Sequence, residues 1–470
     1  MGSNAIHFGT SGWRAVIGED FTFANVRLAA AAIADHARSL KKRPTLLVGH
    51  DTRFFSEDFA QAAAEVLQAR GCRVLFCDSA APTPAIAFEI LRAKLDGAIN
   101  ITASHNPAAY NGVKFSGPDG GPALPEITHD IEARAAALAK KEFFGPTEEH
   151  VKEFERVDVS KNYLARLAEL VRFDIIEKSK LRYVCDALHG CGAGYLDRTL
   201  HEHGIKAKII GAERDVLFDG GGPDPSEENL AELSKMVVEE KAAAGLATDG
   251  DADRFGIVDR DGAFISPNHI LGLAFDYLIE TRGWKLGAAR SVATTQLLDA
   301  VAKFHGVPLY ESPVGFKFIG ARIEKDEIAL GGEESAGMTI RGHVPEKDGI
   351  LACLLVAEMI AARKASLCEQ LSELFRRVGQ EFWPIRVNLS LDAETAARVP
   401  ERLREDVKQF AGRRVTHAER TDGLKLILDG GAWVLLRPSG TEPVVRVYAE
   451  ASSSEISRKL AEEARKWIAR

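Results

Sequence analysis

A serine stands just beyond a short apolar segment that is typical of a buried strand. The segment is Gly97–Ile101, and Ser104 follows it in the string Thr-Ala-Ser-His-Asn-Pro, before a loop that we expect at Asn111–Lys114. Open α/β sheets commonly bind ligands at the carboxyl ends of their strands. Ser104 is therefore a candidate nucleophile, although a lone serine in such a place is more often a turn residue that bonds its own backbone.

Three aspartates, Asp249, Asp251 and Asp253, alternate along one loop and are followed by Arg254. Strand-like segments lead into and out of this acidic loop, so the three carboxylates can converge on one hard cation. A calcium-binding EF-hand loop would need glycine at its sixth position and glutamate at its twelfth, where this chain has Arg254 and Arg260. Carboxylates combined with a phosphate oxygen suit Mg²⁺. The pattern predicts a magnesium site, and the alternative is a solvated acidic turn.

A loop near the end of the chain has the residue types that grip a phosphate group. Ser439, Gly440 and Thr441 offer backbone N–H groups and hydroxyls in a tight turn, and Arg437 supplies a bidentate guanidinium. Arg446 could be a second cation. The neighbouring prolines are also common in ordinary turns, so this loop gains weight only together with the others.

A fourth group of residues could bind a hydroxyl-rich molecule. Glu333 and Ser335 lie between glycines after an apolar segment, and carboxylates and hydroxyls are natural partners of sugar hydroxyls. An exposed acidic turn is the more frequent explanation of such a loop. Lys317, His343 and Lys347 could add positive charge and proton transfer, although each alone is more often a surface residue.

Two residues near Ser104 could assist it. Arg14 follows a loop of small residues and could be a second cation beside the serine. His105 is adjacent in sequence, but neighbouring residues of an extended segment point in opposite directions, so we do not expect it to serve as the base of a serine–histidine pair. His189, in a glycine-rich loop, is expected to be structural.

Helical and strand-like segments alternate in the first ~150 residues, as in a sheet covered by helices. In chain order we expect Ala24–Leu40 (helix), Thr45–Val48 (strand), Ser56–Arg70 (helix), Cys72–Cys77 (strand), Pro84–Ala93 (helix) and Gly97–Ile101 (strand). A charged stretch, Ala139–Arg156, is expected to be a linker or an exposed helix.

A similar order of elements recurs twice before the composition changes. The expected strands are Leu181–Cys185, Lys206–Ile210, Gly245–Thr248, Phe255–Asp259, Ser291–Thr294, Val307–Tyr310 and Ile328–Leu330, with helices at Tyr195–His203, Glu227–Ala243 and Gly349–Arg363. In the last part we expect strands at Trp383–Leu391, Leu424–Leu428 and Trp433–Leu436 and helices at Ala393–Phe410 and Ser454–Ile468.

The sequence therefore predicts an α/β protein with three α/β domains containing mixed sheets and a smaller α+β domain at the end. Each domain would contribute one of the loops described above. The expected bounds are 1–150 for the serine loop, 151–260 for the acidic loop, 261–372 for the sugar-binding loop and 373–470 for the phosphate-binding loop.

Length and composition narrow the class of protein. With 470 residues the chain is too long for one ordinary core. Its net charge of −8 argues against nonspecific nucleic-acid binding as the main function, and no apolar run approaches the ~18 residues of a membrane span. Six cysteines without a C-x-x-C pair argue against a zinc cluster and a disulfide scaffold. We expect a cytoplasmic protein that acts on small molecules, and its oligomeric state stays open.

These motifs, in this order, resemble those of the α-D-phosphohexomutases, and of phosphoglucomutases most closely. The resemblance runs from Gly9–Arg14 through the serine and acidic loops to Arg437–Thr441, which is nearly the whole chain. It implies four domains around a central cleft. It also implies reversible conversion of glucose 1-phosphate into glucose 6-phosphate, through a phosphoserine and a bound glucose 1,6-bisphosphate.

The resemblance assigns roles to the residues introduced above. Ser104 would carry the phosphoryl group, and Mg²⁺ would be held by Ser104, Asp249, Asp251 and Asp253. The transfer site would be lined by Arg14, His105, Lys114 and Arg254. Glu333 and Ser335 would hold sugar hydroxyls, with Lys317, His343 and Lys347 near the sugar. The phosphate that does not react would be held by Arg437, Ser439, Gly440 and Thr441, with Arg446 as the candidate second cation. The general acid and base are not assigned.

The choice of sugar stays open. Glu333 and Ser335 would face O3 and O4, which are equatorial in glucose, mannose and glucosamine alike. Segments 311–317 and 346–349 are similar to those of phosphoglucomutases, whereas 437–443 is closer to the mannose and glucosamine branches. A phosphomannomutase, or an enzyme with both activities, is therefore the alternative, and a phosphoglucosamine mutase ranks third.

Two further classes share part of this set of residues. A phosphatase would use the serine and the metal but hydrolyse the phosphoserine, and the presence of both a sugar loop and a phosphate loop favours transfer over hydrolysis. A sugar-phosphate sensor of the same fold would be expected to lack the serine or an aspartate. This chain has Ser104 and all three aspartates.

Overall fold

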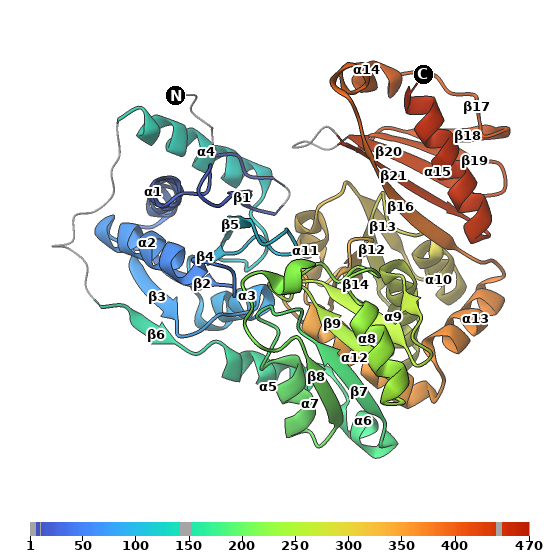
Figure 1. Ribbon diagram of the computed structural model, residues 1–470, viewed down its shortest axis with the longest axis horizontal. Coiled ribbons are helices and arrows are strands. Elements are labelled where there is room, and N and C mark those ends of the chain that lie inside the picture. The colour runs from blue at the N-terminus through green and yellow to red at the C-terminus, as the bar shows by residue number, and fades with distance from the viewer. Residues whose placement is uncertain (1–5, 10, 142–152, 439–443, 470) are drawn as a thin grey trace. The chain divides into compact units, whose positions relative to one another are not determined.

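The computed structural model describes residues 6–9, 11–141, 153–438 and 444–469 (Figure 1). The chain divides into two compact units. One consists of Met1–Pro267 and Gly315–Cys368, and the other of Asn268–Val314 and Glu369–Arg470. Among the described residues, no helix is both long and apolar enough to cross a membrane.

The first unit begins with a six-stranded mixed sheet. Its strands lie in the order β1-β5-β4-β2-β3-β6; β2 pairs in parallel with β3 and β4, whereas β4 and β5 are antiparallel. The strands are β1 (Trp13–Val16), β2 (Thr45–His50), β3 (Arg73–Cys77), β4 (Gly97–Ile101), β5 (Tyr110–Ser116) and β6 (Glu155–Val157). The accompanying helices are α1 (Phe23–Leu40), α2 (Ser56–Ala69), α3 (Thr83–Ala93) and α4 (Pro125–Ala139).

Two expectations for this region need correction. The segment Asn111–Lys114, expected to be a loop, is part of β5. Gly112 permits this, because a Cβ there would lie 2.6 Å from the carbonyl oxygen of Thr102 and 2.7 Å from that of Trp13. The expected linker Ala139–Arg156 ends in strand β6, and its residues 142–152 lie outside the described residues.

The second sheet of this unit has five strands in the order β11-β10-β9-β7-β8. β7 pairs in parallel with β8 and β9, whereas β9 and β10 are antiparallel and enclose the acidic loop. The strands are β7 (Arg182–Asp186), β8 (Lys206–Ile210), β9 (Ala244–Thr248), β10 (Phe255–Asp259) and β11 (Phe264–Ile265). The helices are α5 (Ser160–Leu170), α6 (Phe173–Ser179), α7 (Leu196–Glu202) and α8 (Ala231–Glu239).

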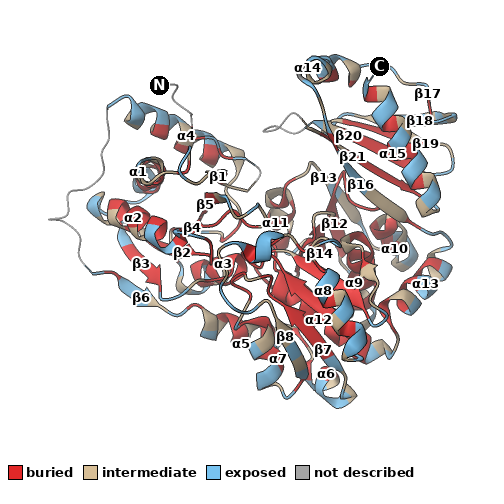
Figure 2. Cartoon of the chain, viewed as in Figure 1, coloured by how far each residue is buried: buried red, intermediate tan, exposed pale blue. Residues whose placement is uncertain are grey.

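The last part of the first unit braces this sheet. Helix α11 (Phe316–Glu324) precedes an antiparallel pair, β14 (Ile328–Glu333) and β15 (Gly337–Ile340), and α12 (Gly349–Arg363) follows. Figure 2 shows the strands around the acidic loop as buried, and α12 is buried from its first residue to Ala361. An amphipathic helix would expose one face, so α12 is a core helix.

The second unit contains a parallel strand pair and an antiparallel sheet. The parallel strands are β12 (Gly287–Ser291) and β13 (Leu309–Ser312), with helices α9 (Pro267–Arg282), α10 (Leu297–His305) and α13 (Leu367–Val378). The antiparallel sheet has the order β16-β21-β20-β19-β18-β17. Its strands are β16 (Trp383–Ser390), β17 (Gln409–Phe410), β18 (Arg413–Glu419), β19 (Leu424–Leu428), β20 (Trp433–Pro438) and β21 (Val444–Ala451), with helices α14 (Ala393–Arg402) and α15 (Ser454–Ala469).

Two element bounds predicted for this unit are wrong. The strand expected at Ser291–Thr294 is β12, which ends at Ser291. This strand contains Arg290, which is buried because it pairs with Asp299 and Glu311. A charged residue interrupts the apolar run by which a buried strand is predicted. The helix expected to reach Phe410 ends at Arg402, and Phe410 belongs to β17.

Candidate active site

Ser104 lies at the end of β4 in an uncommon backbone conformation. Its φ is 52°, in the left-handed region, and the residue is buried. Its Oγ donates a hydrogen bond of 2.7 Å to Oδ2 of Asp249, and its N–H donates one of 2.9 Å to Oγ1 of Thr102. Backbone strain of this kind is found at functional sites more often than elsewhere. The fold thus brings the candidate serine to the acidic loop.

His105 lies closer to the serine hydroxyl than expected. Its Nδ1 is 3.4 Å from Oγ of Ser104. The expectation that the two side chains diverge assumed an extended chain, whereas the left-handed φ of Ser104 turns the backbone and brings them together. His105 is therefore near enough to share a proton with the hydroxyl after a small adjustment.

The acidic loop forms a buried cluster of carboxylates. Asp249, Asp251 and Asp253 are at most 1% exposed, and one oxygen of each lies within 4.8 Å of the others. Oδ1 of Asp251 and Oδ1 of Asp253 have no hydrogen-bond partner among the described residues. Unpaired buried carboxylate oxygens are costly, and a divalent cation would satisfy them. The three aspartates therefore fit Mg²⁺.

Two lysines contact the same carboxylates. Nζ of Lys114 lies 2.5 Å from Oδ2 of Asp251 and 2.8 Å from Oδ2 of Asp253, and Nζ of Lys347 lies 2.9 Å from the latter. Burial alone would raise the pKa of Asp253, but Lys114, Lys347 and Arg254 outweigh it and hold that pKa well below its usual value. Asp253 is thus an anion surrounded by cations.

Asp249 has the opposite environment. Burial, followed by the charges of Asp251 and Asp253, raises the pKa of Asp249 well above its usual value. Its Oδ1 accepts the backbone N–H of Arg254 at 3.0 Å, while Oδ2 accepts the hydroxyl of Ser104. A positive charge placed here would favour the ionised form of Asp249.

Two arginines complete the surroundings of Ser104. Arg14 donates a hydrogen bond of 2.7 Å to Oδ1 of Asn106, and burial together with the charge of Arg254 lowers the pKa of Arg14. Arg254 lies 4.0 Å from Asp253 and 3.9 Å from Asp224, and neither distance is that of a close bidentate pair. Both guanidinium groups thus have donors in reserve for an anion.

The loop between β14 and β15 joins the same region. Glu333 is buried and accepts the N–H of Gly315 at 2.7 Å; burial and the charge of Glu334 raise its pKa to about 7. Gly337 forms a β-bridge with Arg254, and a Cβ at Gly337 would lie 2.3 Å from Cδ of Lys347. The candidate sugar loop, which includes Ser335, therefore packs directly against the acidic loop.

Lys317 and His343 lie in different environments. His343 is buried, and its Nε2 lies 2.6 Å from Oδ2 of Asp348. The other oxygen of this carboxylate, Oδ1, accepts bonds from the hydroxyl of Tyr163 and from the N–H of Leu351. This arrangement fixes the first turn of α12. Lys317 is partly buried, and this burial lowers the pKa of its ammonium group. Its Nζ lies 5.6 Å from the ring centre of Phe318.

The candidate phosphate loop belongs to the second unit. Arg437 and Arg446 are directly opposite each other in the β20–β21 pair, and Nε of Arg437 lies 2.9 Å from Oδ2 of Asp422. Like charges on facing strands favour an anion between them. Ser439, Gly440 and Thr441 lie outside the described residues.

One residue that supports the serine loop was not predicted. Arg53 is fully buried, and its guanidinium donates hydrogen bonds to four carbonyl oxygens of the serine loop and its exit: Ser104, Asn106, Pro107 and Tyr110. Its Nε lies 3.2 Å from Oδ2 of Asp51. The sequence signal was the pair of charged residues, Asp51 and Arg53, that follows the buried segment Thr45–His50. Ser104 likewise follows a buried strand.

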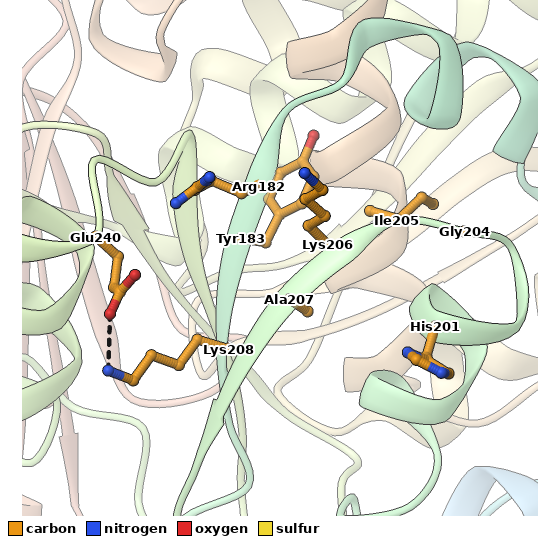
Figure 3. Close-up of a pocket in the computed structure, with 9 residues that line it drawn as sticks. All are labelled: Arg182, Tyr183, His201, Gly204, Ile205, Lys206, Ala207, Lys208 and Glu240. Carbon is orange, nitrogen blue, oxygen red and sulfur yellow. Dashed lines mark hydrogen bonds and ion pairs between the residues drawn. The ribbon is translucent and has the colours of Figure 1, made fainter.

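A pocket elsewhere in the first unit contains none of these residues. It has a volume of about 480 Å³ and lies beside the edge strand β8 (Figure 3). Its lining is basic, and Lys208 forms an ion pair of 2.8 Å with Glu240. Lysines on an edge strand often serve to prevent pairing with another strand. The site built from Ser104 and the acidic loop is therefore the candidate active site.

Four family models match the chain in succession. They describe domains I, II and III of phosphoglucomutase/phosphomannomutase, over residues 5–142, 161–262 and 266–378, and the C-terminal domain, over 394–466. This succession confirms the predicted fold of three α/β domains and a smaller C-terminal domain. Regions I and II contain the two mixed sheets of the first unit except for their edge strands β6 and β11.

The similarity to known proteins covers nearly the whole chain. A phosphoglucomutase/phosphomannomutase of Thermococcus kodakarensis is 31% identical over 97% of this chain and 96% of its own. A phosphoglucomutase of Komagataeibacter xylinus is 30% identical over 97% and 89%. A crystal structure from Thermus thermophilus, named as a candidate phosphomannomutase, has a TM-score of 0.87 and 33% identity and covers 99% of each chain.

The chain belongs to the phosphoglucomutase/phosphomannomutase family, the phosphohexomutases, and is an isomerase of this class. The resemblance stated from the motifs is thereby confirmed at the level of the family.

Proposed function

We propose that this enzyme interconverts glucose 1-phosphate and glucose 6-phosphate through a phosphoserine at Ser104 and a bound glucose 1,6-bisphosphate. The observation that carries the proposal is the 2.7 Å hydrogen bond between Ser104 and Asp249, at the edge of a buried carboxylate cluster flanked by cations. A phosphoryl group on this hydroxyl would meet a metal site on one side and guanidinium groups on the other.

In the first half of the reaction the phosphoryl group leaves Ser104 for O6 of glucose 1-phosphate. The bond between Oγ and phosphorus breaks and a bond from O6 to phosphorus forms, while O6 loses its hydroxyl proton and Oγ gains one to become the serine hydroxyl. Mg²⁺, held by Ser104, Asp249, Asp251 and Asp253, would offset the charge of the phosphoryl group when bound. After the bisphosphate has reversed its orientation in the site, Ser104 accepts the other phosphoryl group, from O1, and glucose 6-phosphate remains.

The remaining residues bind and orient the sugar phosphate. Arg14, His105, Lys114 and Arg254 surround the transferred group, and positioning of this kind accounts for most of the catalysis of phosphoryl transfer. Glu333 and Ser335 hold sugar hydroxyls, with Lys317, His343 and Lys347 beside the sugar. Arg437, Arg446, Ser439, Gly440 and Thr441 bind the phosphate that does not react.

A phosphomannomutase, or an enzyme with both activities, is the second candidate. The Thermococcus relative is named for both sugars, which favours this alternative. A phosphoglucosamine mutase ranks third. Glu333 and Ser335 do not separate these sugars, because O3 and O4 have the same orientation in all three.

The substrate is tested by parallel assays of glucose 1-phosphate, mannose 1-phosphate and glucosamine 1-phosphate, each with Mg²⁺ and a trace of its own bisphosphate. We expect glucose 1-phosphate to give the highest kcat/KM and little free phosphate. A higher value for mannose 1-phosphate would establish the second candidate, and stoichiometric release of free phosphate would establish a phosphatase instead.

We also propose that the enzyme works in the cytoplasm. All six cysteines are free thiols, and five of them are buried. Reduced thiols are the ordinary state in a reducing compartment. Fractionation of cells that express the tagged protein tests this.

A further inference from the structure

A second cavity of about 310 Å³ lies in the first unit, away from Ser104 and the aspartates. Four of the loops that line it follow strands β2, β3, β7 and β8, which form two parallel pairs. The carboxyl ends of parallel strands are where open α/β sheets bind ligands. The cavity therefore uses the same edge of each sheet as the candidate active site, at different strands.

The lining of this cavity suits an anion. It contains Arg198, Arg214 and His189 and no aspartate or glutamate. Nδ1 of His189 lies 2.8 Å from the carbonyl oxygen of Glu213, so the N–H on that nitrogen is used and Nε2 is left for another partner. Arg198 pairs with Glu202 one turn along α7; both side chains are 51% exposed, and such a pair is weak and easily exchanged.

Tyr195 and Gly194 also line this cavity. Tyr195 is only 6% exposed, and its hydroxyl can donate a hydrogen bond to a ligand oxygen. Gly194 adopts a φ of 77°, and the space where its Cβ would be is open.

The cavity is connected to both halves of the candidate active site. Arg214 donates hydrogen bonds to the carbonyl oxygens of Thr52, at 2.9 Å, and of Arg53, at 3.2 Å. Arg53 in turn donates to the carbonyl oxygen of Ser104. On the other wall, the N–H of Cys191 donates a 3.0 Å bond to the carbonyl oxygen of Gly250, within the acidic loop.

We propose that this cavity is a second binding site, for a phosphate group, and that its occupation changes the rate of phosphoryl transfer at Ser104. Free phosphate and a phosphate monoester share the chemistry that would be recognised: a small dianion with several acceptor oxygens. A ligand that draws on Arg214 changes its bonds to Thr52 and Arg53, and so shifts the support of the serine loop. The rate effect depends on the proposed function, whereas the binding does not.

Binding is measured by calorimetry with inorganic phosphate and with glycerol 3-phosphate, which lacks the sugar ring. Arg198→Ala is the test variant and Arg182→Ala the control, because Arg182 lies in the other pocket (Figure 3). We expect Arg198→Ala to weaken one binding event about tenfold and Arg182→Ala to leave it unchanged. Tyr195→Phe, which removes only the hydroxyl, should weaken the same event by a smaller factor. Tighter binding of the ester points to a phosphorylated metabolite, and tighter binding of phosphate points to the free ion.

Equal binding by the wild type, Arg198→Ala and Tyr195→Phe would overturn the second site. The rate effect is measured separately, as the initial rate at saturating glucose 1-phosphate with increasing glycerol 3-phosphate. We expect a change that persists at saturation in the wild type and disappears in Arg198→Ala. Purely competitive inhibition, equal in both proteins, would overturn the coupling while leaving the mutase reaction itself established.

Discussion

At the scale of single residues, the position of Ser104 depends on Arg53, a side chain that does not touch the proposed substrate. One guanidinium holds four carbonyl oxygens around the serine, and its charge is balanced by Asp51. The left-handed φ of Ser104 would otherwise be easily lost, because only surrounding contacts maintain such a conformation.

We therefore predict that Arg53→Ala lowers kcat about a hundredfold by letting the serine shift. It also leaves Asp51 buried without its partner, which should lower the free energy of unfolding by about 3 kcal/mol. Arg53→Lys should recover part of the stability but little of kcat, since an ammonium cannot reach four acceptors. Arg73→Ala, which removes an exposed pair with Glu155, is the control, and equal losses in both variants would contradict the account.

A second prediction concerns Asp253, which faces both Lys114 and Lys347. Asp253→Asn removes a ligand of the proposed metal site, so calorimetry should show Mg²⁺ binding weakened by about a hundredfold or more. The variant also leaves two buried ammonium groups with less compensating charge, so the metal-free protein should be less stable. Asp174→Asn, on an exposed pair, should change neither property.

The pH dependence of stability follows from Glu333. Its pKa is about 7 in the folded protein, compared with about 4.3 when unfolded, so the folded state binds more protons between these values. The contribution of Glu333 to the free energy of unfolding is therefore fully present below about pH 4 and is lost as the pH rises through about 7. Glu333→Gln removes this titration and keeps an oxygen for the N–H of Gly315.

The free energy of unfolding of Glu333→Gln minus that of the wild type should therefore rise by about 3 kcal/mol between pH ~5 and pH ~8, as measured by urea unfolding. Groups that do not interact with Glu333 cancel in this comparison. A difference that is constant across this range would show that Glu333 is not held in its protonated form by burial.

At the scale of elements, the sequence reveals most where a strand carries a loop with unusual residues. β4, β9 and β10 are buried throughout and adjoin the serine and acidic loops, so their positions and their chemistry were both predictable. β5 was not, because Asn111, Gly112 and Lys114 do not look like a strand; Lys114 is buried only because Asp251 and Asp253 neutralise it. Contacts between distant segments decide such residues.

Contacts between distant segments also decide which residues meet in the candidate site, and the sequence alone does not predict them. Ser104 and the three aspartates were found from local patterns, but their contact spans 145 positions and could not be derived from spacing. Arg53 and Asp348 act through long-range hydrogen bonds, to the serine loop and to Tyr163 respectively. Their residue types alone do not distinguish them from surface charges.

The start of α12 gives an element-scale prediction. The N–H of Gly349 donates a 3.0 Å bond to the carbonyl oxygen of Ala252 in the acidic loop, and a Cβ at Gly349 would lie 2.1 Å from the carbonyl oxygen of Arg254. Gly349→Ala should therefore push the helix from the loop, weaken Mg²⁺ binding and cost about 2 kcal/mol or more of stability. Gly221→Ala, whose Cβ would meet only the Asn229 side chain, should be nearly neutral. Similar behaviour of both variants would contradict this role of α12.

At the scale of the whole molecule, the protein combines a net charge of −8 with a site that gathers cations around one acidic loop. The negative surface does not prevent binding of sugar phosphates, because charges around a buried site are screened much less than those at the surface. Lys114 and Lys347 also stabilise the aspartates before any metal binds. The fold should therefore persist without Mg²⁺ while the reaction requires it.

Removal of the metal tests this. Treatment with EDTA should abolish mutase activity, leave the far-ultraviolet circular dichroism unchanged and lower Tm by only a few degrees, as expected for loss of one bound ligand. Readdition of Mg²⁺ should restore the rate. Unfolding on chelation would show that the lysines do not stabilise the acidic loop.

The most direct test of the central claim is transfer of a labelled phosphoryl group to Ser104. The enzyme is incubated with glucose 1,6-bisphosphate carrying radioactive phosphorus, and the labelled peptide is identified after proteolysis. We predict one labelled peptide containing Ser104, loss of the label when glucose 1-phosphate is added, recovery of that label in sugar phosphates, and no labelling of Ser104→Ala. Label at another residue, label retained in Ser104→Ala, or release of the label as free phosphate would contradict the account.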